Sequence, residues 1–235
     1  MRARLLPTRN GRRPTVIRER DRRICWQAAS LLLAYPDETL VADLPMVREA
    51  VDTLPAALSE PLRTLADDLQ AAATQGRLID AQARYVETFD QKRRRTLFLT
   101  YWTAGDTRNR GQAILRFTSA YREAGATPPR HELADHLAVV LEFAATVDPA
   151  GGGELLAAHA TPIAMVRDSL SEHGSPYAGV VGAVAATLPE PGPGDLREAR
   201  RLAMAGPPAE AVGLDLVPYP PAGQALLPLL DGAVR

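Results

Sequence analysis

The segment ELADHLAVVLEFAA, residues 132–145, decides the fold class of this 235-residue chain. Its apolar residues recur every three or four positions, which is the period of an α-helix and not the alternation of a β-strand. The core stripe predicted by this spacing consists of Leu133, Leu137, Val140, Leu141 and Ala144. The opposite side carries His131, Asp135 and Glu142, and the strip between the two carries Glu132, His136, Val139 and Phe143. The segment therefore predicts a helix with one buried face and a mixed flank.

The same period recurs along most of the chain, and no segment shows the alternation of a strand or an Asn-Gly hairpin turn. We therefore predict an all-α, single-domain helical bundle. The expected helices cover residues 19–34, 59–76, 78–89, 106–124, 154–173, 176–188 and 195–205, together with one that Pro128 and Pro129 open before the quoted segment. Proline disrupts helix interiors, so we expect Pro45 and Pro55 to divide the region after Asp37 into short helices.

Three local features refine these boundaries. Ser59 is expected to cap the helix that follows it, with Pro61 in the first turn. Residues 148–153, which include three consecutive glycines, are expected to form a flexible joint. The helix over residues 154–173 is expected to kink at Pro162.

The composition is that of a soluble globular protein, with 46% hydrophobic and 23% charged residues. Its single cysteine, Cys25, excludes an internal disulfide bond and favours a reducing compartment, so we expect the cytoplasm. The longest apolar run near the start of the chain has only four residues, from Leu31 to Ala34. A membrane span needs about 20 such residues, so we expect no direct insertion into a membrane.

Charge is distributed unevenly along the chain. The first 23 residues hold nine arginines and two acidic residues, a net charge of +7, while the remainder carries −8. We predict a disordered basic tail at residues 1–18, a helical domain at 19–190 and a Pro-rich C-terminal extension at 191–235. An alternative is that the basic tail binds nucleic acid, but no aromatic residue lies among its arginines to stack on bases. We expect no nucleic-acid partner.

The stretch HELADH, residues 131–136, resembles the HExxH zinc signature, which would indicate a metal-dependent hydrolase. That signature needs histidines four residues apart, whereas His131 and His136 are five apart. In a regular helix this spacing separates them by about 140°, so they cannot bind one ion. The chain also lacks a GxSxG, GxxxxGK[ST] or GxGxxG pattern. We therefore predict no catalytic residues, no metal and no cofactor.

The segment YVETFDQKRRRTLFLTYWTAGDTRNRG, residues 85–111, is the most distinctive stretch of the sequence. In the helix expected after it, Arg110 falls on the same stripe as Ile114, Phe117 and Tyr121. Asp106, Arg108 and Arg110 are expected to form a charged cluster at the entrance of that helix. The cluster is either functional or a surface ion-pair network.

This segment resembles the NarJ family of cytoplasmic chaperones, which assemble respiratory molybdenum nitrate reductase. The similarity is carried by YVETFD at residues 85–90, the arginines at 93–95, LFLTYWTAGDTRNRG at 97–111, ILRF at 114–117, and ELADHLAVVLEFAA at 132–145. LLLAYPDE at residues 31–38 fits the start of the family pattern, and the resemblance covers roughly residues 20–190. The family pattern usually reads ELPDHL, and here Ala134 replaces the proline, which would permit an uninterrupted helix.

The resemblance implies an all-helical TorD-like bundle that performs no chemistry of its own. Such a protein binds the N-terminal segment of the catalytic alpha subunit and keeps that subunit competent for molybdenum cofactor insertion before membrane attachment. We hypothesise that the client segment binds as an amphipathic helix in a groove with acidic edges. The candidate client-binding residues are Tyr85, Glu87, Phe89, Asp90, Asp106, Arg108, Arg110, Glu132, Asp135, His136 and Phe143. The alternatives are a TorD-like chaperone for another molybdoenzyme and a helical nucleic-acid-binding regulator.

Overall fold

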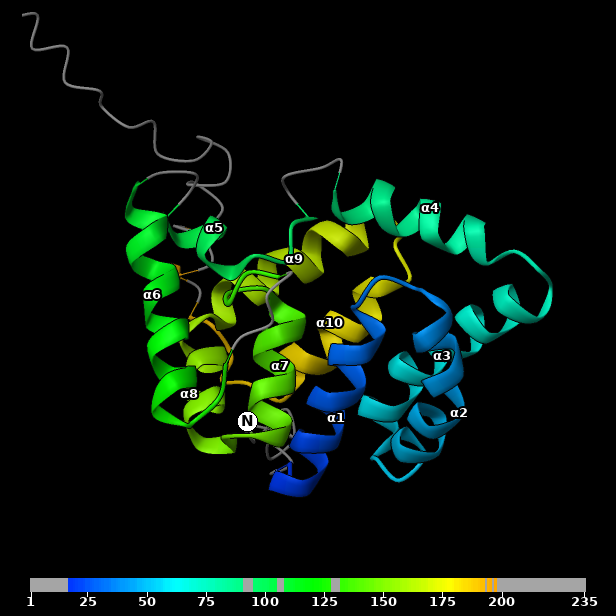
Figure 1. Ribbon diagram of the computed structural model, residues 1–235, viewed down its shortest axis with the longest axis horizontal. Helices are drawn as coiled ribbons and strands as arrows, with labels where there is room; N and C mark the ends of the chain where they lie inside the picture. The colour runs from blue at the N-terminus through cyan, green and yellow to red at the C-terminus, as the bar shows by residue number, and fades with distance from the viewer. Residues whose placement is uncertain are drawn as a thin grey trace, which may run out of the picture.

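The computed structural model describes residues 17–90, 95–104, 108–127, 132–192, 194–195 and 197, and these ranges contain ten α-helices and no β-strand (Figure 1). The all-α prediction is confirmed. The helices are α1 (Glu19–Leu32), α2 (Glu38–Val51), α3 (Ala56–Thr74), α4 (Leu78–Phe89), α5 (Leu99–Ala104), α6 (Arg108–Glu123), α7 (Leu137–Thr146), α8 (Pro149–Ala158), α9 (Ala160–Glu172) and α10 (Tyr177–Ala186).

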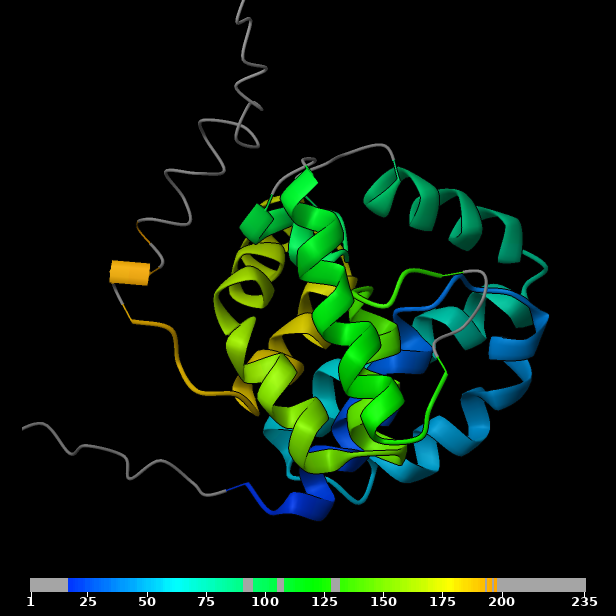
Figure 2. The ribbon, with the colours of Figure 1, turned by 60° about the vertical axis from the view of Figure 1, so that its left-hand side comes forward.

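Helix α1 lies at the centre of the bundle and packs against α7, α2, α3 and α10 (Figures 1 and 2). Cys25, Ala29 and Leu32 are fully buried because their spacing places them on one inward face of the helix. A buried leucine contributes roughly 1.5–3 kcal/mol relative to an exposed one. Trp26 lies beside them, and its Nε1 donates a hydrogen bond of 2.8 Å to Oγ1 of Thr187, which ties α1 to the end of α10.

The residues expected to form a flexible joint instead form the first turn of α8, so that prediction is wrong. The carboxylate of Asp148 caps this helix by accepting hydrogen bonds from the N–H groups of Ala150, at 3.1 Å, and Gly151, at 2.9 Å. Gly152 lets α8 approach α7 closely, because a Cβ at this position would lie 2.5 Å from the Cα of Ala144. The close packing of α7 and α8, and not backbone flexibility, explains why residue 152 is a glycine.

Two prolines lie further inside helices than expected. Pro45 sits within α2, whose inward face buries Val47, so the predicted division of this region at Pro45 is wrong. Helix α3 contains Pro61 and begins before Ser59, because the carbonyl of Pro55 accepts the N–H of Ser59 at 3.0 Å. Ser59 is therefore not the cap. In both helices, burial of the apolar face outweighs the backbone hydrogen bond that proline removes.

The helix expected over residues 154–173 is two helices, α8 and α9, separated at His159. Pro162 lies in the first turn of α9, where its missing N–H costs little. Its ring would clash with the carbonyl of Ala158 if the helix continued without a break. The chain consequently breaks at His159 and does not kink at Pro162.

The quoted acidic segment is also different from its prediction, because residues 132–136 are not helical and α7 begins at Leu137. Leu133, which we expected in the core, is 44% exposed, whereas Asp135, which we expected outside, is 0% exposed. The helix expected from Pro128 onward and the uninterrupted helix expected through Ala134 are therefore wrong. The backbone here bonds instead to a distant segment, which is described below.

The separation of about 140° predicted between His131 and His136 requires a regular helix. Because residues 132–136 are not helical, this separation gives no reason to exclude zinc. His131 lies outside the described residues, and within the described ranges no three His, Cys, Asp or Glu residues are grouped to hold a metal ion. No helix in those ranges is long and apolar enough to cross a membrane.

Several predictions fall where the structure gives no description. These are the basic tail over residues 1–16, the arginines at 93 and 94, the cap Asp106, the start of the helix at Pro128, and most of the C-terminal extension, including most of the helix expected over residues 195–205.

Replacing Gly152 with alanine should destabilise the bundle, because the added Cβ would clash with the backbone of α7. We expect Gly152→Ala to lower the free energy of unfolding in urea by roughly 1–3 kcal/mol. Gly111→Ala is the matched control, since a Cβ at this helical glycine meets nothing within 4 Å. It should instead raise stability by roughly 0.5–1 kcal/mol. A Gly152→Ala protein as stable as the wild type would contradict the close approach of α7 and α8.

Candidate functional site

Two chain segments far apart in the sequence pair just before α5 and α7. The N–H of Leu99 donates to the carbonyl of Asp135 at 3.0 Å, and the N–H of Leu137 donates to the carbonyl of Leu97 at 2.9 Å. Phe98 and His136 consequently lie opposite each other in an antiparallel bridge, with their rings 5.3 Å apart and edge-to-face. The bridge fixes both side chains at one end of α7.

A buried carboxylate reinforces this bridge. Oδ2 of Asp135 accepts hydrogen bonds from Oγ1 of Thr100, at 2.6 Å, and from the N–H of Thr100, at 3.2 Å. Arg110 of α6 lies next to the pair: its Nε donates to Oγ1 of Thr100 at 3.3 Å, and its Nη2 is 4.0 Å from the carboxylate. The guanidinium also lies over the ring of Phe98, 5.3 Å from the centroid. These contacts offset the cost of burying the acid.

Tyr121 of α6 holds the same turn from the other side. Its hydroxyl donates a 2.7 Å hydrogen bond to the carbonyl of Ala134, and its ring packs 4.4 Å from that of Phe143. Burial, with a smaller contribution from Asp135, raises the pKa of Tyr121, so the hydroxyl keeps the proton that it donates. Both rings are almost fully buried. Tyr121 and Phe143 therefore shape the turn from the inside.

Helix α4 is held at both ends. Near its start, Nε2 of Gln82 donates to the carbonyl of Pro36 at 3.0 Å, and one turn later the hydroxyl of Tyr85 donates to the carbonyl of Leu33 at 3.0 Å. At its C-terminus the buried Arg95 donates from Nε to the carbonyl of Thr88 at 3.0 Å. Helices end with unpaired carbonyls, so Arg95 acts as a side-chain cap for α4. No local sequence pattern predicts this role of Arg95.

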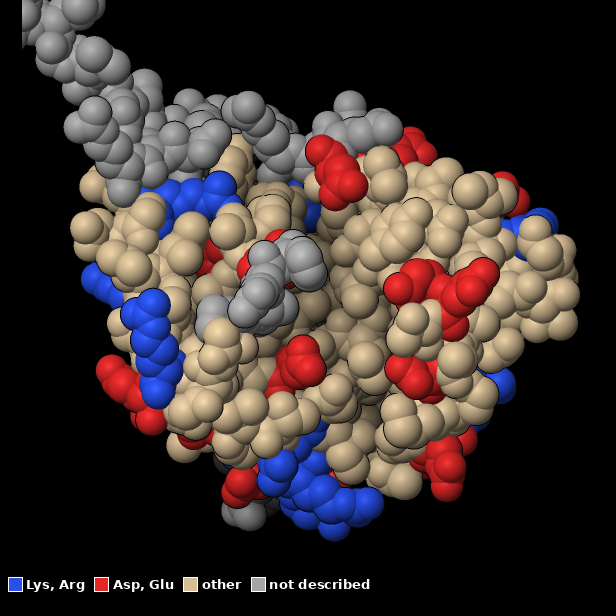
Figure 3. Space-filling model, in the orientation of Figure 1, with Lys and Arg blue, Asp and Glu red and all other residues tan. Residues whose placement is uncertain are grey.

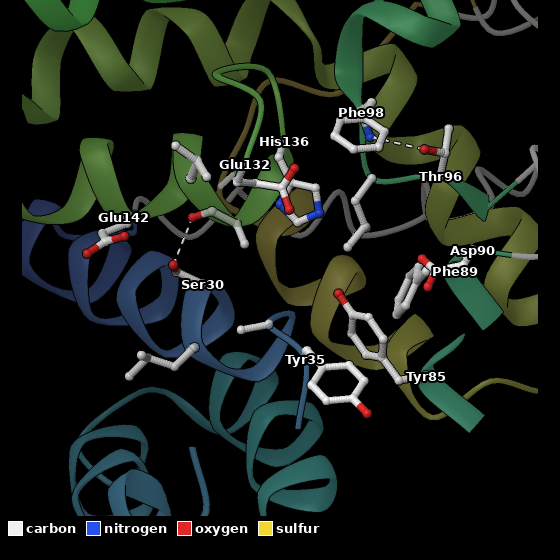
Figure 4. Close-up of a pocket in the computed structure, with 15 residues that line it drawn as sticks. Ser30, Tyr35, Tyr85, Phe89, Asp90, Thr96, Phe98, Glu132, His136 and Glu142 are labelled. Atoms are coloured by element: carbon white, nitrogen blue, oxygen red, sulfur yellow. Dashed lines mark hydrogen bonds between the residues drawn. The ribbon is translucent and has the colours of Figure 1, made fainter. Parts of the chain in front are cut away.

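These elements enclose a cavity of about 490 Å³ between the C-terminal ends of α1 and α4, residues 96–98 and the start of α7, which we call the groove (Figure 4). At its base, the hydroxyl of Ser30 donates to the carbonyl of Ala138 at 2.8 Å and joins α1 to α7. The residues that line it are Ser30, Leu31, Ala34, Tyr35, Tyr85, Phe89, Asp90, Thr96, Leu97, Phe98, Glu132, His136, Ala138, Val139 and Glu142.

One side of the groove is aromatic. The rings of Tyr85 and Phe89 lie 4.8 Å apart, and both pack against Tyr177 of α10, at 5.8 Å and 4.9 Å. Tyr35, which is 46% exposed, meets Tyr85 edge-on at 5.6 Å. Tyr85 and Phe89 are only 8% and 7% exposed, so the cluster offers a rigid apolar wall, and Tyr35 supplies most of its exposed surface.

Acidic side chains also line the groove. Asp90 lies beside Phe89 at the end of α4, whereas Glu132 lies near His136 and Glu142 lies on α7 (Figure 4). Among the described residues, no lysine or arginine lines the groove. The space-filling view shows acidic side chains around the hollow of this face, while basic side chains gather at the end where α1 begins (Figure 3). Carboxylates beside an apolar surface attract ligands that carry both basic and apolar groups.

His136 points into the groove beside Glu132, across from Phe89 and Asp90 (Figure 4). Its side chain is 8% exposed, and within the described residues its Nδ1 has no hydrogen-bond partner. Burial lowers the pKa of His136 below its ordinary value, against the opposing effect of Glu132, Asp135 and Asp90. The imidazole is therefore neutral at neutral pH, and its unpartnered Nδ1 is buried.

The structure brings only some of the candidate residues together. Tyr85, Phe89, Asp90, Glu132 and His136 line the groove. Asp135, Arg110 and Phe143 lie behind it in the contacts described above, and Glu87 is exposed on α4 outside the lining. Asp106 and the side chain of Arg108 lie outside the described residues. Of the predicted cluster of Asp106, Arg108 and Arg110, the structure therefore describes only the side chain of Arg110. Its guanidinium lies beside the buried Asp135.

Sequence reasoning missed the half of the groove that α1 and residues 96–98 provide. Val139 carried a signal, since helical spacing placed it on one strip with Glu132 and His136, whereas Glu142 was expected on the opposite side. No such signal exists for Ser30, Leu31 or Tyr35, because periodicity does not tell which helix ends meet.

Comparison with known proteins adds to this geometry. Residues 52–182 match the family described as Nitrate reductase delta subunit. Over 171 residues the chain is 47% identical to the nitrate reductase-like protein NarX of Mycobacterium tuberculosis strain H37Rv, which covers 70% of this chain and 24% of NarX. The chain thus spans about a quarter of the length of that relative.

Two further relatives match this chain over a similar number of residues. The probable nitrate reductase molybdenum cofactor assembly chaperone NarJ of Bacillus subtilis strain 168 is 28% identical over 168 residues, 72% of this chain and 90% of that protein. The nitrate reductase molybdenum cofactor assembly chaperone NarJ of Escherichia coli strain K12 is 33% identical over 149 residues, 63% of each protein.

Removing the buried carboxylate should destabilise the protein more than removing an exposed one. Asp135→Ala leaves the hydroxyl and N–H of Thr100 without their acceptor, and we expect a loss of about 3 kcal/mol in urea unfolding. Glu142→Ala, which removes an exposed acid of the groove, should change stability by less than about 0.5 kcal/mol. Equal effects of the two substitutions would show that the Asp135 network does not hold the bridge.

Stability should also depend on the protonation of His136. Because the folded-state pKa is lowered, the unfolded chain binds a proton that the folded chain does not as pH falls below the ordinary value of 6.5. Folding stability is thus complete above this pH and is lost as pH falls through it. Urea unfolding at pH 7.5 and 5.5 should show a smaller loss for His136→Gln than for the wild type. An identical loss of stability in both proteins would assign the pH dependence to another group, for example to His159, whose pKa is also lowered by burial.

Proposed function

Because this chain belongs to the nitrate reductase delta subunit family, we propose that it is an assembly chaperone for a respiratory molybdenum nitrate reductase. Its client is the catalytic alpha subunit. The chaperone holds the N-terminal segment of that subunit and keeps the subunit competent for molybdenum cofactor insertion before membrane attachment. The names of the two NarJ relatives support the assembly role. The proposed compartment is the cytoplasm.

The groove is the observation that carries the client-binding part of this proposal. Its volume of about 490 Å³ lies within the range of roughly 300–1,000 Å³ typical of ligand pockets. It has room for the anchoring side chains of one face of a short helix and not for a folded domain. The aromatic side accepts apolar anchors, and Asp90, Glu132 and Glu142 pair with basic residues that flank them.

The proposed role requires binding and release and no catalytic step. Recognition of an unfolded segment must be reversible, since the client leaves once its cofactor is inserted. Carboxylates at the edge of a groove suit this requirement, because partly exposed ion pairs contribute only about 0.2–1 kcal/mol each. They orient the client and speed its capture without making release slow. The buried apolar contacts then supply most of the affinity.

Calorimetry with a peptide from the N-terminus of the nitrate reductase alpha subunit tests this proposal. We expect binding to weaken by roughly two- to ten-fold in the Asp90→Asn/Glu132→Gln protein at low salt, because two ion pairs are lost. The difference should shrink at 0.5 M NaCl, where exposed charges are screened.

Glu87→Gln is the matched control, since it removes an acid that is exposed on α4 outside the lining of the groove. It should leave the affinity unchanged. An equal weakening in the control and the double variant would reflect net charge and would contradict recognition in the groove. Failure of the wild-type protein to bind the peptide would oppose the client assignment.

A further inference from the structure

The groove is one of two cavities that lie along the same pair of helices. Helices α1 and α7 run side by side, and the groove lies at the C-terminal end of α1 and the start of α7 (Figure 1). A second cavity, of about 530 Å³, lies at the opposite end of both helices and is lined by Gln27 of α1 and Thr146 of α7 among others. Glu142, one turn before Thr146, lines the groove. The two cavities thus mark a path along the α1–α7 contact.

The chain that precedes α1 has the chemistry that the groove selects. Residues 1–16, MRARLLPTRNGRRPTV, contain five arginines and no acidic residue. Leu5 and Leu6 form an apolar pair, with Arg2 and Arg4 directly before it. Among the described residues, the lining of the groove offers aromatic rings and three carboxylates and no lysine or arginine. Residues 1–16, which we call the basic arm, are therefore complementary to it in both charge and apolar character.

The basic arm is also long enough to reach the groove. From Ile17 to Leu31 the path along α1 is about 21 Å, at a rise of about 1.5 Å per residue. The eleven residues from Leu6 to Val16 span up to about 36 Å when extended. On the way, Oε1 of Gln27 is buried and has no hydrogen-bond partner within the described residues, which leaves an acceptor for a main-chain N–H.

We propose that, in the client-free protein, the basic arm of this same chain occupies the groove, with Leu5 and Leu6 against the aromatic side and Arg2 or Arg4 beside Asp90 and Glu132. The client then displaces the arm, a consequence that rests on the proposed function. Tethering gives the arm an effective concentration of the order of millimolar, so weak contacts suffice to cover the groove. Only client segments that compete successfully with the arm are retained. The apparent affinity for the client is reduced in proportion to the fraction of molecules in which the arm has left the groove.

Hydrogen exchange of the full-length protein tests the contact itself, without any client. Arg2→Gln/Arg4→Gln/Leu5→Ser/Leu6→Ser should speed amide exchange in residues 132–139 relative to the wild type, and leave α3 unchanged. The matched control is Thr8→Ala/Asn10→Ala, which changes two polar residues of the same arm and should leave exchange as in the wild type. Unchanged exchange in the quadruple variant would overturn the proposal. Protection that grows with protein concentration would also overturn it, because the arm would then come from a second copy.

Calorimetry with the alpha-subunit peptide tests the competition. Releasing the arm should tighten peptide binding in the quadruple variant by roughly two- to ten-fold, the opposite sign to the loss of a groove carboxylate. Weaker or unchanged peptide binding in this variant would overturn the competition. If no form of the protein binds the peptide, the proposed client is wrong, while the exchange experiment still decides whether the arm covers the groove.

Discussion

The buried carboxylate of Asp135 is the constraint on which the candidate site depends. Burying an acid without hydrogen-bond donors would cost several kcal/mol, and within the described residues Oδ2 of Asp135 has such donors while its buried Oδ1 has none. Thr100 supplies two donors from the start of α5, and Arg110 approaches from α6. Three elements distant in sequence are thereby brought to one point. The same contact sets the bridge that places Phe98 and His136 in the wall of the groove.

The groove combines two forces that act over different distances. Its three carboxylates act at long range and favour the approach of basic segments, and the effect depends on salt. The aromatic side acts only on contact and favours apolar anchors. His136 lies between them as a neutral group, so the wall stays apolar at neutral pH. A proton on this ring would both oppose its burial and repel a basic ligand, so acid weakens the site through one residue.

The sequence predicted the fold class and most helices, because these follow from local periodicity. Helix α4 has the predicted boundaries of residues 78 and 89. Gly76 and Gly125, with positive φ angles of 67° and 74°, follow α3 and α6 close to the predicted helix ends at residues 76 and 124. The apolar pattern failed at residues 132–136, where the expected burial of Leu133 and Asp135 is reversed. The partners of this turn, Leu99 and Thr100, lie about 35 residues away in sequence, and no local pattern reports them.

The turn before α7 shows why its shape does not require the proline of the family pattern. Proline would restrict the backbone directly, whereas here Ala134 is held by the hydroxyl of Tyr121, and the next carbonyl by the N–H of Leu99. Its geometry therefore depends on α6, which supplies both Tyr121 and Arg110. Helix α6 packs mainly on α5 and α8 at the edge of the bundle, so it has fewer neighbours to hold it than α1 or α7. Any displacement of α6 would release Ala134 and Asp135 together, and the wall of the groove would move with them.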